Sequence, residues 1–281
     1  MNTLSKSCKL NKKRLYLDPE LSKINSYIII NGSSYSYRNS DVEYKFRQNS
    51  NFYWLTGINE PNYKLAINCY EKRIIIVPPV FNELDLIWDN TIPDFKLMKN
   101  DFEYDEILFD LSGINIDYVN LSINQKLLLD KIEEYRVIKN RHEIKLMQSA
   151  CINSQSTHDN LMQTIVTYVD NNEKLIQKQF IYFTECLKNV TGQSYNPICA
   201  TGTNSSILHY SKNNSNLKFG DLFLIDAGCE YLNYASDITR TYGIGEIDCY
   251  KKKIIEIVTE INIKCKELVK DNVNFKDIYN K

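Results

Sequence analysis

Several features are missing from this sequence, and each absence narrows the kinds of protein it can encode. No apolar run reaches the roughly 20 residues of a membrane-spanning helix, since the longest, near 27–30 and 74–77, have the length of a strand. An excess of one charge sign is also missing, because 34 basic and 35 acidic side chains leave a net charge of −1. We therefore expect neither a membrane nor a nucleic acid as a partner.

Cys-x-x-Cys pairs, internal repeats and low-complexity segments are absent as well. The eight cysteines are scattered through apolar or helical stretches. This pattern predicts reduced thiols and a cytoplasmic location. With 43% apolar and 25% charged residues, the 281-residue chain has the composition of a globular protein of one large or two ordinary domains.

The most informative stretch is a continuous apolar run that ends in an aspartate. The run 222–225 predicts a strand buried on both faces, and turn residues then precede a second β-prone stretch at 234–242. Asp226 ends the first strand, and Asp237 is expected on the second. A hairpin between the two strands would bring both carboxylates to neighbouring places on one sheet.

Two interpretations of these acids follow from the residues alone. A buried aspartate needs a metal, an arginine or several donors, and oxygen ligands of this kind suit Mn, Mg, Ca or a two-metal hydrolytic site. In the structural alternative, Asp226 caps a turn and Asp237 pairs with Arg240. Spacing alone gives the two interpretations equal weight.

The motifs around the two acids add to this spacing. Asp226-Ala-Gly-Cys-Glu-Tyr and Asp237-Ile-Thr-Arg-Thr resemble the metal-binding hairpin of the pita-bread metallopeptidases, in particular the Xaa-Pro branch of prolidase and aminopeptidase P. The resemblance implies that Asp226 chelates one metal and that Asp237 bridges two. Upstream, Ile-Leu-His209-Tyr resembles the segment whose histidine contacts the substrate or steers protons, which implies that role for His209.

A second resemblance lies in the first half of the chain. From the residues alone, the interleaved aromatic and polar side chains of 37–57 predict an edge strand. The motifs Phe46-Arg-Gln-Asn-Ser-Asn-Phe, Leu55-Thr-Gly and Glu60-Pro are, however, similar to the N-terminal domain of aminopeptidase P and prolidase. Trp88 resembles a family tryptophan that can reach a neighbouring subunit's pocket, although we favour core packing for it.

The resemblances imply an α/β (α+β) protein with two domains. Residues 1–135 are expected to form an aminopeptidase P-type, creatinase-like N-terminal domain, and residues 136–281 the first part of a pita-bread domain. The implied activity is that of a metallopeptidase, an Xaa-Pro dipeptidase or Xaa-Pro aminopeptidase that hydrolyses the bond to proline with two Mn ions, Co or Zn being alternatives. The expected partners are peptides with proline at the second position and a second copy of the chain.

Helical spacing predicts a helix at about 144–165, whose apolar stripe includes Ile144, Cys151 and His158. His158 is expected to be a packed helical histidine and not a metal ligand. Further helices are expected at 172–188 and 250–269.

The resembled family uses a histidine and two glutamates as further ligands, and no histidine follows His209 in these residues. Four glutamates do follow the hairpin, but a strand end and the polar face of a helix account for them: Glu246, Glu256, Glu260 and Glu267. We therefore expect an incomplete catalytic domain that is inactive alone, as a fragment, a split gene product or a degenerate relative. A non-catalytic peptidase-like interaction module and a dimerisation protein are the alternatives.

Overall fold

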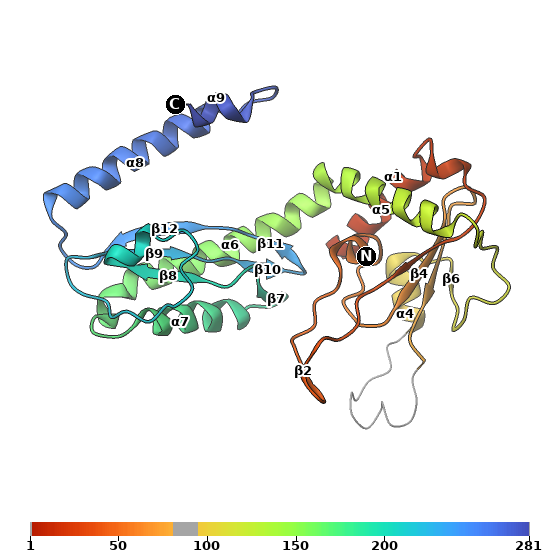
Figure 1. Ribbon diagram of the computed structural model, residues 1–281, viewed down its shortest axis with the longest axis horizontal. Helices are drawn as coiled ribbons and strands as arrows, with labels where there is room; N and C mark the ends of the chain where they lie inside the picture. The colour runs from red at the N-terminus through yellow and green to blue at the C-terminus, as the bar shows by residue number, and fades with distance from the viewer. Residues whose placement is uncertain (1, 81–94, 281) are drawn as a thin grey trace. The chain divides into compact units, whose positions relative to one another are not determined.

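The computed structural model describes residues 2–80 and 95–280, so Trp88 lies outside the described residues. The chain divides into two compact units (Figure 1): unit 1 is Met1–Ser149 with Leu232–Tyr234, and unit 2 is Ala150–Tyr231 with Ala235–Lys281. All eight cysteines are free thiols, as predicted. None of the described helices is both long enough and apolar enough to cross a membrane.

Unit 1 alternates helices with short strands. Its described elements are α1 (Thr3–Tyr16), η1 (Leu21–Lys23), β1 (Ile28–Asn31), β2 (Tyr37–Asn39), β3 (Val42–Glu43), α2 (Ser50–Thr56), β4 (Lys64–Asn68), β5 (Arg73–Val77), α4 (Phe95–Phe102), β6 (Glu106–Ile107) and α5 (Leu121–Val137).

A four-stranded sheet in the order β1-β4-β5-β6 forms the centre of unit 1. β4 is antiparallel to both β1 and β5, and β6 is parallel to β5. Ile74 and Ile76 pack in one core with α1, α2 and α5, whereas Ile75 packs on the other face with Leu108 and Leu121. Because helices or loops cover both faces, the strands are continuous apolar runs that do not alternate.

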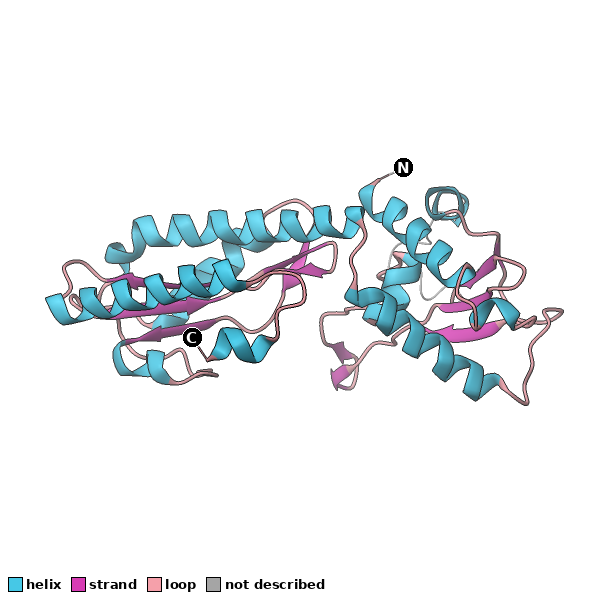
Figure 2. Cartoon of the chain, turned by 90° about the horizontal axis from the view of Figure 1, so that it is seen from above, coloured by secondary structure: helices cyan, strands magenta, loops and turns pink. Residues whose placement is uncertain are grey.

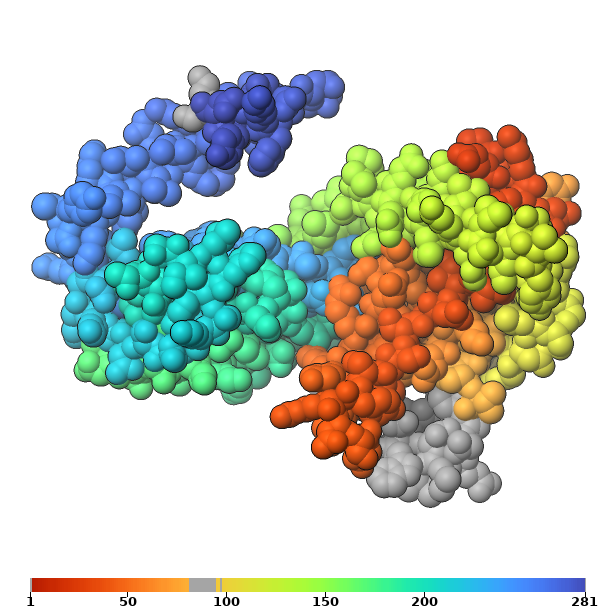
Figure 3. Space-filling view, viewed as in Figure 1, coloured from red at the N-terminus to blue at the C-terminus, as the bar shows by residue number. Residues whose placement is uncertain are grey.

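Residues 50–56 form the buried helix α2, so the prediction of an edge strand over 37–57 is wrong for this segment. The helix begins because the side chain of Asn49 accepts hydrogen bonds from the backbone amides of Asn51 and Phe52. It ends at Gly57, whose φ of 70° suits a residue without a Cβ. Within 37–57 the described strands are β2 and β3, which pair in an exposed hairpin that stands out from the surface of unit 1 (Figure 3).

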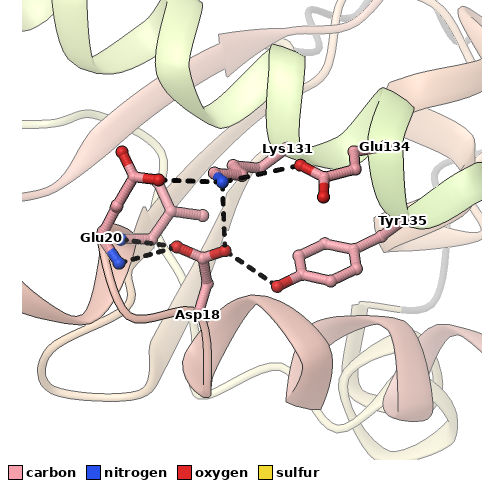
Figure 4. Close-up of polar contacts among 6 residues, drawn as sticks. Asp18, Glu20, Lys131, Glu134 and Tyr135 are labelled. Carbon is pink, nitrogen blue, oxygen red and sulfur yellow. Dashed lines mark hydrogen bonds and ion pairs between the residues drawn. The ribbon is translucent and has the colours of Figure 1, made fainter.

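A buried aspartate ties α5 to the turn after α1 (Figure 4). Oδ1 of Asp18 accepts hydrogen bonds from the backbone amides of Glu20 and Leu21, both at 2.9 Å. Oδ2 accepts a 2.8 Å hydrogen bond from the hydroxyl of Tyr135, and Lys131 Nζ lies 3.9 Å away. The carboxylate is thus held by donors on every side, which is what a buried charge requires.

Unit 2 contains most of α6 (Arg141–Thr164), whose first residues belong to unit 1. Its other elements are η2 (Ile165–Tyr168), α7 (Glu173–Glu185), β7 (Val190–Gln193), β8 (Ile198–Thr201), η3 (Gly202–Ser206), β9 (Leu222–Asp226), β10 (Cys229–Tyr231), β11 (Tyr234–Ala235, whose first residue belongs to unit 1), β12 (Thr239–Gly243), α8 (Cys249–Leu268) and α9 (Phe275–Tyr279).

Unit 2 contains two three-stranded antiparallel sheets, β12-β9-β8 and β11-β10-β7. The hairpin that the sequence predicts contributes β9 and β12 to the first sheet and β10 and β11 to the second. Helices α6 and α7 lie along the first sheet (Figures 1 and 2), where Leu161 and Phe180 pack against Phe223 and Ile225. Burial alternates along strand β9. Phe223 and Ile225 are buried, whereas Leu222, Leu224 and Asp226 are half-buried. The prediction of a strand buried on both faces is therefore wrong, because helices cover only one face of this sheet among the described residues.

Candidate active site

The hairpin brings Asp226 and Asp237 together, as the sequence predicts, but Asp237 does not lie on a strand. β9 pairs with β12 so that Asp226 is opposite Thr239. Asp237 lies two residues before that position, in the interval 236–238 between β11 and β12. The strand is interrupted where the backbones crowd, since a Cβ at Gly228 would overlap the carbonyl oxygen of Ser236.

One tyrosine joins the two carboxylates. The hydroxyl of Tyr195 lies 2.6 Å from Oδ1 of Asp226 and 2.9 Å from Oδ1 of Asp237, within donor distance of both. Burial raises the pKa of Tyr195, and the hydrogen bonds to Asp226 and Asp237 raise it further, so the hydroxyl keeps its proton. The two carboxylates therefore converge on one point without a positive side chain between them.

Tyr195 does not emerge from the sequence as a site residue. Its only local signal is its place in Ser194-Tyr-Asn-Pro197, just before β8. The partners lie 31 and 42 residues away along the chain. No periodicity reports such a contact, which depends on the pairing of β8 with β9.

A pocket of about 580 Å³ contains this cluster. His209, Asp226 and Asp237, the three site residues that the sequence predicts, all line it, together with Gln177, Tyr195, Asn196, Pro197, Ile198, Tyr210, Ser211 and Asn213. His209 is exposed and follows η3 in a loop. The structure thus gathers the predicted residues and adds Tyr195 to them.

The loop that carries His209 is ordered by a buried carboxylate at the start of α7. Oε1 of Glu173 accepts hydrogen bonds from the backbone amide of Thr201 at 2.7 Å and from the side chain of Asn204 at 3.1 Å. Oε2 accepts from the hydroxyl of Tyr210 at 2.7 Å and from the backbone amide of Ser215 at 3.0 Å. Glu173 therefore joins both ends of the segment around His209.

The chemistry of the cluster suits part of a metal centre. Two carboxylates that approach one point are oxygen donors of the kind that hard divalent cations take. A two-metal hydrolytic centre needs more ligands than two aspartates. Among residues 2–80 and 95–280, no group of three or more histidine, cysteine, aspartate or glutamate side chains could hold a metal ion.

Comparisons with known proteins match both halves of the chain. The profile of metallopeptidase family M24 matches residues 145–281, and that of the aminopeptidase P N-terminal domain matches residues 9–116. An uncharacterized peptidase of Saccharomyces cerevisiae is 27% identical over 300 residues, covering 98% of this chain and 56% of the relative. An Xaa-Pro aminopeptidase of Haemophilus influenzae is 32% identical over 280 residues, covering 87% and 63%. The chain therefore spans little more than half the length of these relatives.

Solved structures show the same fold. Aminopeptidase P from Escherichia coli in its low-pH form superposes with a TM-score of 0.76 at 22% identity, covering 94% of this chain and 68% of that chain. Proline aminopeptidase P II from Yersinia pestis gives a TM-score of 0.74 at 23% identity, covering 96% and 69%. These matches confirm the predicted fold class, an N-terminal α/β domain followed by part of a pita-bread domain.

Proposed function

Because this chain belongs to the Xaa-Pro peptidase family of metallopeptidases, we propose that it carries part of a dinuclear Mn site for hydrolysing the peptide bond to proline. The observation that carries the proposal is the convergence of Asp226 and Asp237 on the hydroxyl of Tyr195. The pocket around them also contains His209, whose imidazole is of the kind that accepts or donates protons in catalysis. Two acids and a proton-transfer group in one pocket are part of what metal-assisted hydrolysis requires.

Each residue has a role in this proposal. Asp226 would hold one metal, Asp237 would hold both, and His209 would contact the substrate or pass a proton. Metals held there would supply Lewis-acid chemistry and would activate a water for hydrolysis. Tyr195 holds the two carboxylates in place through its hydroxyl. We propose Mn, with Zn and Co as alternatives; one solved E. coli aminopeptidase P is Zn-substituted.

The proposed substrates are peptides with proline at the second position, and the activity is that of an Xaa-Pro aminopeptidase or an Xaa-Pro dipeptidase. Fungal and bacterial relatives carry the former name, and an E. coli aminopeptidase P has been solved with the inhibitor Pro-Leu. We place the protein in the cytoplasm and propose that it forms a homodimer.

We further propose that these 281 residues do not hydrolyse peptides alone. Asp226 and Asp237 offer at most about four oxygen contacts, so a metal held by them alone stays hydrated and weakly bound. Two of the glutamates after the hairpin stabilise α8 instead, since Glu256 and Glu260 form ion pairs with Lys253 and Lys264. A dinuclear centre needs further ligands, which the described residues that line the pocket do not supply.

An assay with purified chain tests both the proposed peptidase function and the proposed inactivity of these 281 residues alone. Gly-Pro and a longer peptide with proline at the second position are incubated with the chain and Mn²⁺, beside an Asp237→Asn control. We expect no turnover from the chain alone, and turnover once a polypeptide bearing the family's later histidine and glutamate ligands is added. Turnover by the chain alone that Asp237→Asn abolishes would contradict its inactivity. Failure of the supplemented chain on both peptides would contradict the peptidase function.

The alternative of a non-catalytic peptidase-like module makes a different prediction. Such a module does not need two carboxylates on one hydroxyl, since their mutual repulsion is a cost that a bound cation would offset. If the cluster had no function, replacing both aspartates by asparagine would stabilise the chain without any effect on Mn²⁺ binding. Calorimetric titration of the double variant with Mn²⁺ distinguishes the two cases.

A further inference from the structure

Helix α6 touches the carboxylate-bearing hairpin at two points, each next to one of the aspartates. Nε2 of His158 lies 2.9 Å from the carbonyl oxygen of Ala227, which follows Asp226. Oγ of Ser154 lies 2.8 Å from Oγ of Ser236, which precedes Asp237.

The two α6 residues form one face. Ser154 and His158 are four positions apart on the helix, so they lie one above the other. Both are fully buried, each with an exposed fraction of 0%. Neither Ser154 nor His158 lines the pocket. Any influence on the site must therefore pass through the hairpin backbone and the hydroxyl of Ser236.

The direction of the hydrogen bonds can be assigned. A carbonyl only accepts, so His158 carries its proton on Nε2, and its Nδ1 has no partner among the described residues. Ser236 donates its hydroxyl proton to the carbonyl oxygen of Cys229 at 3.0 Å. Ser154 then has two acceptors for its own proton, Oγ of Ser236 at 2.8 Å and Sγ of Cys229 at 3.3 Å, and it accepts a 2.9 Å hydrogen bond from the backbone amide of Cys229.

The hairpin has little freedom to move between these two points. At Gly228 the two backbones approach so closely that no side chain fits against Ser236. The backbone amide of Ala227 also donates to the carbonyl oxygen of Ile238 at 3.1 Å, across the hairpin. If α6 moved at either contact, the hairpin backbone would move with it. The aspartate next to that contact would therefore shift by a similar amount.

We propose that Ser154 and His158 are positioning residues that set the placement of Asp226 and Asp237 for a divalent cation. The inference rests on the proposed function only for the identity of the ligand, because the contacts themselves require no metal. Each residue acts through the neighbour of one carboxylate, as groups behind a metal ligand commonly do. Buried polar side chains cost free energy unless their donors are used, and here the donors of Ser154 and His158 are used on the hairpin.

Four variants of the 281-residue chain test the proposal. His158→Leu removes the donor, and His158→Gln keeps an N–H of similar reach. Ser154→Ala removes the hydroxyl. Thr157→Val is the matched control, because Thr157 is buried on α6 but bonds only to the carbonyl oxygen of Asn153 in its own helix. Circular dichroism first establishes that each variant folds.

Two measurements are made on each variant, the Kd for Mn²⁺ by calorimetry and the hydrogen exchange of the amides in 226–238. For His158→Leu and Ser154→Ala we expect Mn²⁺ affinity to fall on the order of tenfold, the lower end for residues behind a ligand. The hairpin amides should exchange at least several-fold faster, while amides of β8 stay unchanged. His158→Gln and Thr157→Val should remain close to the wild-type chain.

Unchanged exchange and unchanged Mn²⁺ affinity in a folded His158→Leu or Ser154→Ala chain would overturn the proposal. If His158→Leu does not fold, Ser154→Ala and His158→Gln decide. If the wild-type chain binds Mn²⁺ no better than an Asp226→Asn, Asp237→Asn double variant, the metal role in the proposed function fails. Hydrogen exchange of the hairpin then still decides whether α6 positions the two aspartates.

Discussion

Tyr210 donates a 2.7 Å hydrogen bond to the fully buried carboxylate of Glu173. Three further donors reach the same carboxylate, and together they hold the segment around His209. Glutamine has one acceptor oxygen where glutamate has two, so Glu173→Gln would set an NH₂ group against two donors. We expect the free energy of unfolding to fall by about 1–3 kcal/mol, the cost of unsatisfied buried donors. Urea unfolding measures it.

The control for this substitution is Glu267→Gln, on exposed α8, which should change the unfolding free energy by less than about 0.5 kcal/mol. Limited proteolysis gives a second measure, since cleavage within 202–215 should accelerate only in Glu173→Gln. Equal stability of the two variants would mean that the Glu173 cluster does not hold the loop.

A pH effect is expected at Asp18. Burial alone would raise the pKa of this carboxyl, but hydrogen bonds from the Leu21 amide, Tyr135 and the Glu20 amide, with the charge of Lys131, outweigh burial and lower it. A carboxyl with a lowered folded-state pKa contributes stability that is complete above its unfolded value and is lost as pH falls through the folded one. Unfolding free energy should therefore decline below about pH 4, the ordinary range of an aspartate.

Asp18→Asn is the variant that checks this effect. Its unfolding free energy at pH 7 should be lower by about 1–3 kcal/mol, because the amide loses the charge-assisted bonds. Between pH 4 and pH 2 it should lose less stability than the wild-type chain in urea titrations. Parallel pH profiles for the two chains would show that protonation of Asp18 does not cause the loss of stability at low pH.

Much of the fold could be predicted from the sequence because its signals are local. The apolar runs of β1 and β5 are flanked by turn residues, and the hairpin of β9 and β12 is marked by motifs on both strands. His158 lies buried on α6, as its place on a helical stripe predicts. The grouping of Asp226, Asp237 and His209 in one pocket follows from the motifs as well.

Other features depend on competition between local sequence signals, or on contacts between residues that are far apart in the sequence. Asn49 and Gly57 cap α2 and override the strand preference of its aromatic residues. On α6 the helical stripe was ambiguous, since Ile144 and Cys151 are exposed whereas Leu146 and Ala150 are buried in their place. These candidates are all apolar, so periodicity alone does not select the buried face.

Self-association is expected for the 281-residue chain. None of the residues of α8 is buried, and Ile254, Ile257 and Ile261 are 38%, 46% and 49% exposed on one side of the helix. An exposed apolar stripe of this kind favours burial against a second copy. Sedimentation velocity should show a dimer or larger species, and Ile257→Gln with Ile261→Gln should shift it toward monomer. Lys266→Gln, on the opposite side of α8, should not; a monodisperse wild-type monomer would contradict the prediction.

His209 is expected to serve the substrate and not the metal. Its side chain lines the pocket from an exposed loop, whereas the carboxylates that converge on Tyr195 are those of Asp226 and Asp237. His209→Ala should therefore leave the Kd for Mn²⁺ unchanged within about twofold, since it removes no oxygen ligand. Asp226→Asn should weaken Mn²⁺ binding in the same titration. In a chain supplemented with the later ligands, the loss of a positioned proton-transfer group should lower kcat by about 10²–10⁴-fold. If metal content instead falls in proportion to activity, His209 is a ligand, and the division of roles between loop and hairpin is wrong.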